Sequence, residues 1–275
     1  MDQLSNILQR FTMNTEVFFT GALCGISHLE KQTNQGHLHL LQSGEITIIN
    51  EQGQSLVFNQ PTVIFIPLPN QHRIIGSNDN PPKLVCANVI YDQAHSNPIA
   101  EALPTLLHFQ FNQCPKIKQV ALSLFDEAFQ DNCGRLPMLN ALTDVFIIHI
   151  LRFVLNNKMM QHGLLAGLSH PQLSKVLLAI QSNPEHPWGL QEMADIALMS
   201  RSKFAELFKR VVGQSPGDYL LDWRIIIAKG LLKQNKSVAL VANVVGYENG
   251  SALARVFRKK LGVSPKQWLL SSQEN

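Results

Sequence analysis

Two stretches of this sequence repeat one pattern at a distance of 49 residues. FAELFKRVVGQSP begins at Phe204, and LARVFRKKLGVSP begins at Leu253. In both, apolar residues recur every three or four positions, which predicts an amphipathic helix. Both end in Gly-x-Ser-Pro. Gly213 and Gly262 suit the left-handed residue that closes a helix, and Ser-Pro suits the N-cap and first position of the next helix. The chain is therefore expected to build one helix and one exit turn twice.

A shorter helix is predicted before each copy, in LQEMADIALMS from Leu190 and in VALVANVVGYE from Val238. Aligning Ala194 with Ala242 gives an offset of 48, so the turn of the second copy is one residue longer. Each copy thus has the order of a helix-turn-helix. The segment between them, SPGDYLLDWRIIIAKGLLKQNKS, predicts one long amphipathic helix that fixes their separation. Two helices held in this way can enter successive major-groove segments about 34 Å apart.

Charge divides the chain into two parts. Residues 1–168 carry 9 Lys and Arg against 12 Asp and Glu, a net charge of −3, and residues 169–275 carry 14 against 8, a net charge of +6. All three tryptophans also lie in the second part. Gly163, Gly167 and Pro171 interrupt the helical pattern at the transition, which predicts a boundary near residues 161–171. A basic second part is compatible with nucleic acid, although net charge alone is weak support.

The first part changes from strands to helices near residue 95. Residues 17–92 contain short alternating or apolar runs between turn signals, which is typical of a small β-sandwich or barrel. Residues 98–162 follow a helical period in IKQVALSLFDEAF and LNALTDVFIIHILRFVL. The second of these segments is so apolar that we expect a buried face, in an ordinary core helix, a dimer seam or a clamp between domains.

Residues 188–268, from WGLQEMADIALMSRSKFAELFKR to VGYENGSALARVFRKKLGVSPKQW, resemble the DNA-binding domain of the AraC/XylS family of bacterial transcription regulators. MSRSKFAELFKRVVGQSPGDYLLDWR resembles the branch whose N-terminal domain is a cupin. The expected fold class is α+β, with an N-terminal cupin-like β-barrel, a helical linker and an all-α C-terminal domain of two helix-turn-helix units joined by a long helix. We expect a sensor domain at 1–96, a linker or dimerisation region at 97–165 and a DNA-binding domain at 166–275.

The resemblance implies a sequence-specific DNA-binding regulator, most often an activator. Its implied partners are double-stranded DNA, RNA polymerase, a small-molecule or oxidant signal, and a second copy of the chain. A metal-dependent cupin enzyme is the alternative function, disfavoured by the attached DNA-binding part.

The resemblance also implies which side chains face DNA. The positions facing the groove are Arg201, Ser202, Lys203 and Glu206 in the first unit, and Asn249, Gly250, Ser251, Ala252 and Arg255 in the second. Arg255 is the strongest candidate, because a guanidinium pairs bidentately with guanine. Glu206 could accept from cytosine or simply face solvent. The side chains expected to contact phosphates are Lys209, Arg210, Arg258, Lys259 and Lys260.

Histidines in the first part indicate an effector pocket or a metal site. His37, His39 and Glu45, with His72 from a second segment, resemble the ligand set of metal-binding cupins. Imidazole and carboxylate are suitable ligands for a divalent transition metal. Glu45 lies later than that pattern requires, so the ligand set is incomplete. The alternative is that His39 and His72 are pocket or core histidines.

Cys24 and Cys86 resemble the sensing cysteines of an oxidant-responsive branch of the family. The thiolate is the reactive form of cysteine, yet neither residue has an activating cation beside it. No Lys or Arg lies within six residues of Cys24, and Lys83 falls on the opposite strand face from Cys86. An activating group would have to come through the fold, with His39 and His72 as candidates. We expect Cys86 to react first with hypochlorous acid; the alternative is that it is a small buried hydrophobe.

The remaining features favour the cytoplasm. The first residues, MDQLSNILQRFT, lack the basic flank and apolar run of a signal peptide. No segment reaches the roughly 18 uninterrupted apolar residues of a membrane span. The four cysteines form no CxxC pair, and we expect reduced thiols.

Overall fold

The computed structural model describes residues 3–10, 13–32, 34–91, 97–157, 159–160 and 162–271. The chain forms two compact units, Met1–Ala166 and Gly167–Asn275, so the division falls inside the stretch 161–171 where glycine and proline interrupt the helical pattern. The boundary that we expected at residue 96 lies outside the described residues.

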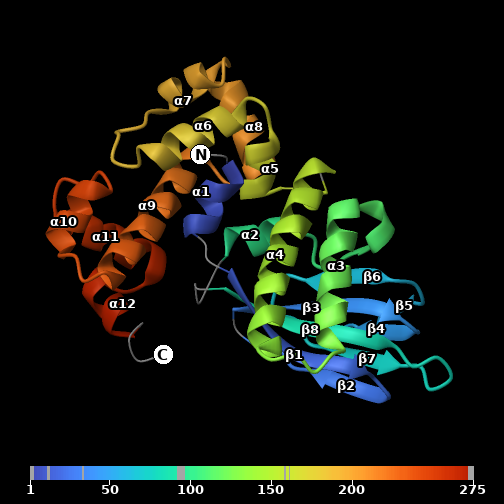
Figure 1. The fold of residues 1–275 in the computed structure, drawn as a ribbon. Coiled ribbons are helices and arrows are strands. Elements are labelled where there is room, and N and C mark those ends of the chain that lie inside the picture. Colours follow the sequence, from blue (N-terminus) through green and yellow to red (C-terminus); the bar gives the residue numbers. More distant parts are fainter. Residues whose placement is uncertain are drawn as a thin grey trace. The chain divides into compact units, whose positions relative to one another are not determined.

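The first unit contains two antiparallel sheets (Figure 1). The five-stranded sheet has the order β1 (Met13–Ala22), β8 (Lys83–Tyr91), β3 (Gln35–Ser43), β6 (Thr62–Ile66), β9 (Leu107–Gln110). The four-stranded sheet has the order β2 (Gly25–Leu29), β7 (His72–Gly76), β4 (Ile46–Asn50), β5 (Ser55–Phe58). The β-rich cupin-like fold predicted for this part is confirmed.

One apolar segment, residues 61–76, forms two strands in different sheets. The segment PTVIFIPLPNQHRIIG forms β6 in the larger sheet and β7 in the smaller one. Pro67 and Pro69 lie between them, and a proline has no N–H to donate to a strand ladder. The chain therefore leaves one sheet after Ile66 and enters the other at His72.

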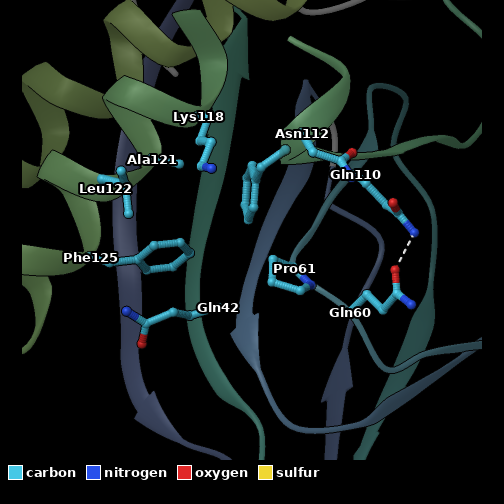
Figure 2. A pocket seen from close by; sticks show the side chains of 10 residues that line it. Gln42, Gln60, Pro61, Gln110, Asn112, Lys118, Ala121, Leu122 and Phe125 are labelled. Atoms are coloured by element: carbon cyan, nitrogen blue, oxygen red, sulfur yellow. Dashed lines mark hydrogen bonds between the residues drawn. The ribbon is translucent and has the colours of Figure 1, made fainter. Parts of the chain in front are cut away.

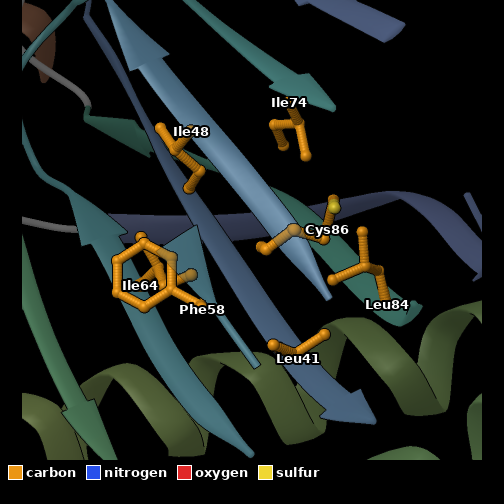
Figure 3. Close-up of a cluster of buried hydrophobic side chains, with 8 residues drawn as sticks. Leu41, Ile48, Phe58, Ile64, Ile74, Leu84 and Cys86 are labelled. Carbon is orange, nitrogen blue, oxygen red and sulfur yellow. The ribbon is translucent and has the colours of Figure 1, made fainter. Parts of the chain in front are cut away.

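Both sheets contribute to one hydrophobic core (Figure 3). The larger sheet supplies Leu41, Ile64, Leu84 and Cys86, and the smaller sheet supplies Ile46, Ile48, Phe58 and Ile74. Because neighbours along a strand point to opposite faces, only alternate residues of each strand enter this core. The arrangement is a sandwich whose inner faces are apolar.

Helices cover the larger sheet. The helical elements of this unit are α1 (Gln3–Arg10), α2 (Pro98–Ala102), a 3-10 turn at Phe111–Gln113, α3 (Pro115–Ala128) and α4 (Arg135–Asn156). α3 packs on α4, and α4 packs on β1. Asp144 Oδ1 accepts from the backbone N–H of Thr15 at 2.8 Å, and Asn140 Oδ1 accepts from that of Val17 at 2.9 Å. These side chains satisfy N–H groups on the edge of the sheet that β8 does not pair.

The stretch 97–165, expected as a helical linker or dimerisation region, lies in this first unit. It also contains β9, which pairs with β6, so it is not purely helical. By length and composition α4 is apolar enough to cross a membrane, although a core helix passes the same test. Its contacts with β1 and α3 are those of a core helix.

The second unit is helical in its described residues. After α5 (Leu164–Ser169), which spans the division, its helices are α6 (Leu173–Ser182), α7 (Leu190–Ile196), α8 (Arg201–Val212), α9 (Pro216–Lys233), α10 (Val238–Val244), α11 (Gly250–Leu261) and α12 (Pro265–Ser271). The predicted repeat is confirmed: α7–α8 and α10–α11 are two short-helix, turn, long-helix units. The helix α9 joins them.

The predicted helix ends are also confirmed. Gly213 and Gly262 adopt φ of 88° and 76°, in the left-handed region. Ser215 caps α9 by accepting from the N–H of Asp218, and Ser264 accepts from the N–H of Gln267. The turns between paired helices span residues 197–200 and 245–249, so the second is one residue longer, as the offset predicts.

Three histidines lie buried in the first unit. His37, His39 and His72 are each at most 2% exposed, and the Nε2 atoms of His39 and His72 are 2.9 Å apart. Burial lowers the pKa of all three, and the other imidazoles of the cluster lower it further for His39 and His72. The pKa of His72 falls to about 4. The cluster is therefore neutral at pH 7.

Acidification should destabilise the first unit through this cluster. A buried base with a lowered pKa binds fewer protons folded than unfolded, so stability falls as pH drops from 6.5 toward 4. Between pH 7 and about pH 5, His72 alone should cost about 2 kcal/mol of unfolding free energy. Urea unfolding followed by circular dichroism measures it. Tryptophan fluorescence reports separately on the second unit, which holds all three tryptophans.

His72→Gln should reduce this pH dependence, since the amide does not titrate. His28→Gln, on the exposed face of β2, should retain it. Equal pH dependence in wild type and His72→Gln would contradict the neutral-cluster interpretation.

Candidate nucleic-acid interface

The helices α8 and α11 each have one buried and one exposed face. Phe204, Phe208 and Val212 are buried in α8, and Leu253 and Phe257 are buried in α11. The aromatic rings of Phe204 and Phe208 lie 5.6 Å apart, and Phe208 also contacts Tyr219 of α9. In the second helix-turn-helix, the buried face of α11 packs in a cluster of α9, α10 and α11 residues around Leu253 and Phe257.

The exposed faces carry most of the side chains predicted to read DNA. The exposed members of that set are Arg201, Ser202, Lys203, Glu206, Asn249, Ser251 and Arg255, while Gly250 and Ala252 are half-buried. Two polar faces thus stand opposite two apolar faces. The arrangement offers guanidinium, ammonium, hydroxyl and carboxylate groups to a partner, which are the groups that read base edges.

Asn249 has a structural role that the sequence interpretation missed. Its Oδ1 accepts from the N–H of Ala252 at 3.0 Å and caps α11. The side-chain oxygen therefore already accepts one hydrogen bond, and its second lone pair and the amide nitrogen remain to meet a base. At Gly250 an added Cβ would lie 3.4 Å from Val238, so the start of α11 packs closely on α10.

The five side chains expected to contact phosphates are all exposed and lie in the last turns of α8 and α11. Lys260 differs from the others, because its Nζ lies 2.7 Å from Asp222 Oδ1 of α9. This ion pair ties α11 to the long helix. Basic residues in a last helical turn also interact favourably with the helix dipole. Lys259 and Arg258 are therefore the better phosphate candidates in α11.

Arg224 on α9 contacts both the loop before α7 and the turn between α10 and α11. Its Nε donates to the carbonyl of Pro184 at 2.7 Å, and its Nη2 donates to the carbonyl of His186 at 2.9 Å. Its guanidinium also lies 5.3 Å from the ring centre of Tyr247, in the turn between α10 and α11. One side chain of the joining helix thus binds the loop before α7 and the turn after α10. We call this set of contacts the Arg224 clamp.

The two turns differ at the residue where both adopt a left-handed conformation. That residue is Leu198, with φ of 56°, in the first helix-turn-helix and Gly246, with φ of 78°, in the second helix-turn-helix. An added Cβ on Gly246 would lie 2.5 Å from the carbonyl oxygen of Glu185 and 2.8 Å from Arg224 Nη2. Glycine is therefore required beside the clamp. Leu198 is 81% exposed, so its side chain meets no such obstacle.

The Arg224 clamp was not predicted from the sequence. Arg224 follows Trp223 in an apolar helix, and a basic residue in such a run is the one signal available. Its hydrogen-bond acceptors are backbone carbonyls, which leave no mark in a sequence. The contact of Lys229 Nζ with the ring of Trp268, 5.5 Å from its centre, joins residues 39 positions apart and was likewise not predicted.

In the first unit, the structure separates the two candidate sensing cysteines by exposure. Cys24 is exposed between β1 and β2, whereas Cys86 is buried in the sandwich core. The β3–β8 register places His39 opposite Cys86. Burial raises the pKa of Cys86 to about 12 and lowers that of His39, so neither group is charged at neutral pH. His39 therefore supplies no activating cation, and the expectation that Cys86 reacts first is not favoured.

The buried histidines are the residues predicted as possible ligands of a cupin metal centre. Nε2 of His39 and Nε2 of His72 hydrogen bond to each other, and Nδ1 of His37 and of His39 has no hydrogen-bond partner among the described residues. Glu45 lies in the turn after β3, where its N–H donates to Asn80. No group of three His, Cys, Asp or Glu within the described ranges is placed to hold a metal ion.

Comparisons with known proteins agree with both units. Residues 2–156 match a family described as Cupin, and residues 193–271 match a family described as Helix-turn-helix domain. An uncharacterized HTH-type transcriptional regulator of Haemophilus influenzae is 29% identical and covers 98% of this chain and 97% of its own. The HTH-type transcriptional regulator AlkR of Acinetobacter baylyi is 27% identical over 98% of this chain and 99% of its own.

The RCS-specific HTH-type transcriptional activator RclR of Escherichia coli is 25% identical over 84% of this chain and 82% of its own. With two family matches and these relatives, the resemblance inferred from the repeats is confirmed. The chain belongs to the AraC-type helix-turn-helix transcriptional regulators that carry an N-terminal cupin domain.

Proposed function

We propose that this regulator binds specific DNA sequences in the cytoplasm through residues 167–275, and that it is not an enzyme. The observation that carries the proposal is the duplicated unit, in which α8 and α11 bury one face and expose a polar face. The net charge of +6 on residues 169–275 favours a polyanionic partner.

The exposed side chains divide by chemistry into those that would contact base edges and those that would contact phosphates. Arg255 lies in the middle of the exposed face of α11, where its guanidinium can reach a guanine. Glu206 occupies the exposed face of α8, where it can accept from cytosine N4. Lys209, Arg210, Arg258 and Lys259 at the helix ends serve phosphates, which position a protein without reading sequence.

The Arg224 clamp sets the spacing between the two DNA contacts. A rigid pair of helix-turn-helix units fits major-groove segments that are about 34 Å apart. Because α9 is one continuous helix and Arg224 ties both units to it, the pair has one preferred separation. One chain then contacts two groove segments, as a dimer of single units does.

The cupin unit supplies the signal. A relative named as an RCS-specific activator supports an oxidant, and the separate cavity described in the next subsection supports a small molecule. RNA polymerase is the proposed partner on the promoter, and transcription with purified components measures activation or repression. A second copy of the chain is the proposed partner of α4, on which Met138 and Val145 are exposed, and sedimentation velocity measures it.

A metal-dependent cupin enzyme is the weaker alternative. The histidines form a hydrogen-bonded neutral cluster, and Glu45 does not join it. Metal content of the purified chain separates the two functions, since one tightly bound transition metal per chain would favour the enzyme.

Substitutions in α11 should separate reading from anchoring. Arg255→Ala should cost about 1–3 kcal/mol of binding free energy and relax preference at one or two base pairs, because a bidentate contact is lost. Lys259→Ala should weaken all sequences about equally and lower the salt slope by about one. Binding to a selected DNA pool over a range of salt measures both. Arg255→Ala binding with unchanged sequence preference would show that α11 does not read bases.

Loss of the Arg224 clamp should make the separation between the two helix-turn-helix units less fixed. Arg224→Met removes two hydrogen bonds from a charged donor, each worth about 1.5–3 kcal/mol, and frees the turn at Tyr247. The variant should discriminate less than wild type between the selected site and the same site with one base pair inserted between its halves. Lys233→Met, at the exposed end of α9, is the matched control. Equal spacer discrimination in all three proteins would exclude the clamp as the cause.

Oxidation should reach Cys24 before Cys86. Brief exposure of the folded chain to hypochlorous acid should modify the exposed thiol, while the buried thiol with its raised pKa reacts only after unfolding in urea. Peptide mass spectrometry measures the order. Reporter transcription in cells with Cys24→Ser should lose the oxidant response, whereas Cys133→Ser, at another exposed thiol, should keep it. A full response in Cys24→Ser cells would leave a pocket ligand as the signal.

A further inference from the structure

A cavity of about 230 Å³ lies in the first unit, between α3 and the edge of the larger sheet (Figure 2). It is separate from the sandwich core, since none of its lining residues belongs to that cluster. Phe111, Ala121 and Phe125 form its apolar wall, and each is at most 5% exposed. The rings of Phe111 and Phe125 meet edge to face at 5.8 Å. The wall therefore presents a fixed aromatic surface.

The rim of the cavity is polar and carries one cation. Gln42, Gln60, Gln110 and Asn112 contribute amide groups, and Gln110 Nε2 donates to Gln60 Oε1 at 2.5 Å. Lys118 is the one charged side chain in the lining. None of the ion pairs found among the described residues engages it. In Figure 2 its ammonium group points toward the hollow.

These features restrict the ligand by size, polarity and charge. Drug-sized ligands occupy about 300–1,000 Å³, so this cavity suits a smaller molecule. An ammonium group beside amide donors stabilises a carboxylate through charge-assisted hydrogen bonds. The aromatic wall takes an apolar body, and no acidic residue lines the cavity to bind a cation. We infer that the cavity binds a small organic carboxylate with an aromatic or short aliphatic body.

A ligand here would join α3 to the larger sheet. It would contact α3 on one side and the ends of β3 and β9 on the other. α3 packs on α4, which in turn holds the edge strand β1 through Asp144 and Asn140. Occupancy should therefore slow hydrogen exchange in α3 and α4. A role for this site as the effector pocket rests on the proposed function, whereas binding itself does not.

Binding is tested on the full chain with benzoate, 3-phenylpropionate and octanoate, each against its neutral amide. Ligand-observed NMR gives the dissociation constants, and hydrogen exchange locates the contact. We expect at least one carboxylate to bind with at least about tenfold preference over its amide, and to protect residues 107–125. Lys118→Met should abolish that preference. Lys116→Met, on the same helix but outside the lining, should keep it.

A second variant tests the cavity itself. Leu122 lines the hollow yet is 59% exposed, so Leu122→Trp can cover the opening without disturbing the core, and it should weaken all carboxylates. The inference is overturned if no carboxylate binds up to about 10 mM, if amides bind equally, or if Lys116→Met and Lys118→Met behave alike. DNA binding by the unliganded chain is scored separately, so failure here leaves the DNA-binding proposal intact, and failure there leaves this site intact.

Discussion

The second unit depends on Arg224. A guanidinium has five donors in a rigid plane, and here it bonds two carbonyls of one loop while its face lies near Tyr247 of another. Two helix-turn-helix units joined by a helix would otherwise share few direct contacts. The Lys260–Asp222 ion pair adds a tie between the long helix α9 and α11, and the Lys229–Trp268 contact adds one between α9 and α12. Residue 246 has to be a glycine, because a side chain there would collide with the loop that contains Glu185.

In the first unit, burial governs the chemistry of the histidine cluster and of Cys86. The same removal from water lowers the pKa of the histidines and raises that of Cys86, because in each case the charged form loses its hydration. Neutral groups can then share an apolar sandwich without ion pairs. Cys24 is an exposed candidate thiol outside this core, and the cavity beside α3 is the proposed ligand site.

The repeat made the second unit predictable in detail. Glycine at a helix end and serine-proline at the next helix start are local signals, so the ends of α8, α9 and α11 could be placed from sequence. The side chains expected to face DNA came from the family resemblance, and helical periodicity agreed with their exposure. The Arg224 clamp could not be predicted, because its acceptors are backbone atoms about 40 residues away. The roles of Asn249 as a cap and Lys260 as an ion-pair partner were likewise hidden by their exposed, polar character.

The first unit was predictable only in outline. Strand-like patterns gave the β-rich class, but the assignment of β6 and β7 to different sheets depends on tertiary pairing across the proline-rich connection. The short strand β9 lies in a stretch whose wider pattern is helical, and only pairing with β6 defines it. Likewise, nothing local to Cys86 reveals that the register places it opposite a neutral histidine.

The two helix-turn-helix units are copies in tandem, and they are no longer equivalent. Their turns differ in length, and Leu198 and Gly246 occupy the same place in them. The first offers Glu206 from its exposed face and the second offers Arg255. A DNA site read by such a pair has no reason to be palindromic. Such a site is asymmetric, and a chain bound to it has one orientation along the duplex. Reversing the site would therefore reverse the direction in which the two helix-turn-helix units lie along the duplex.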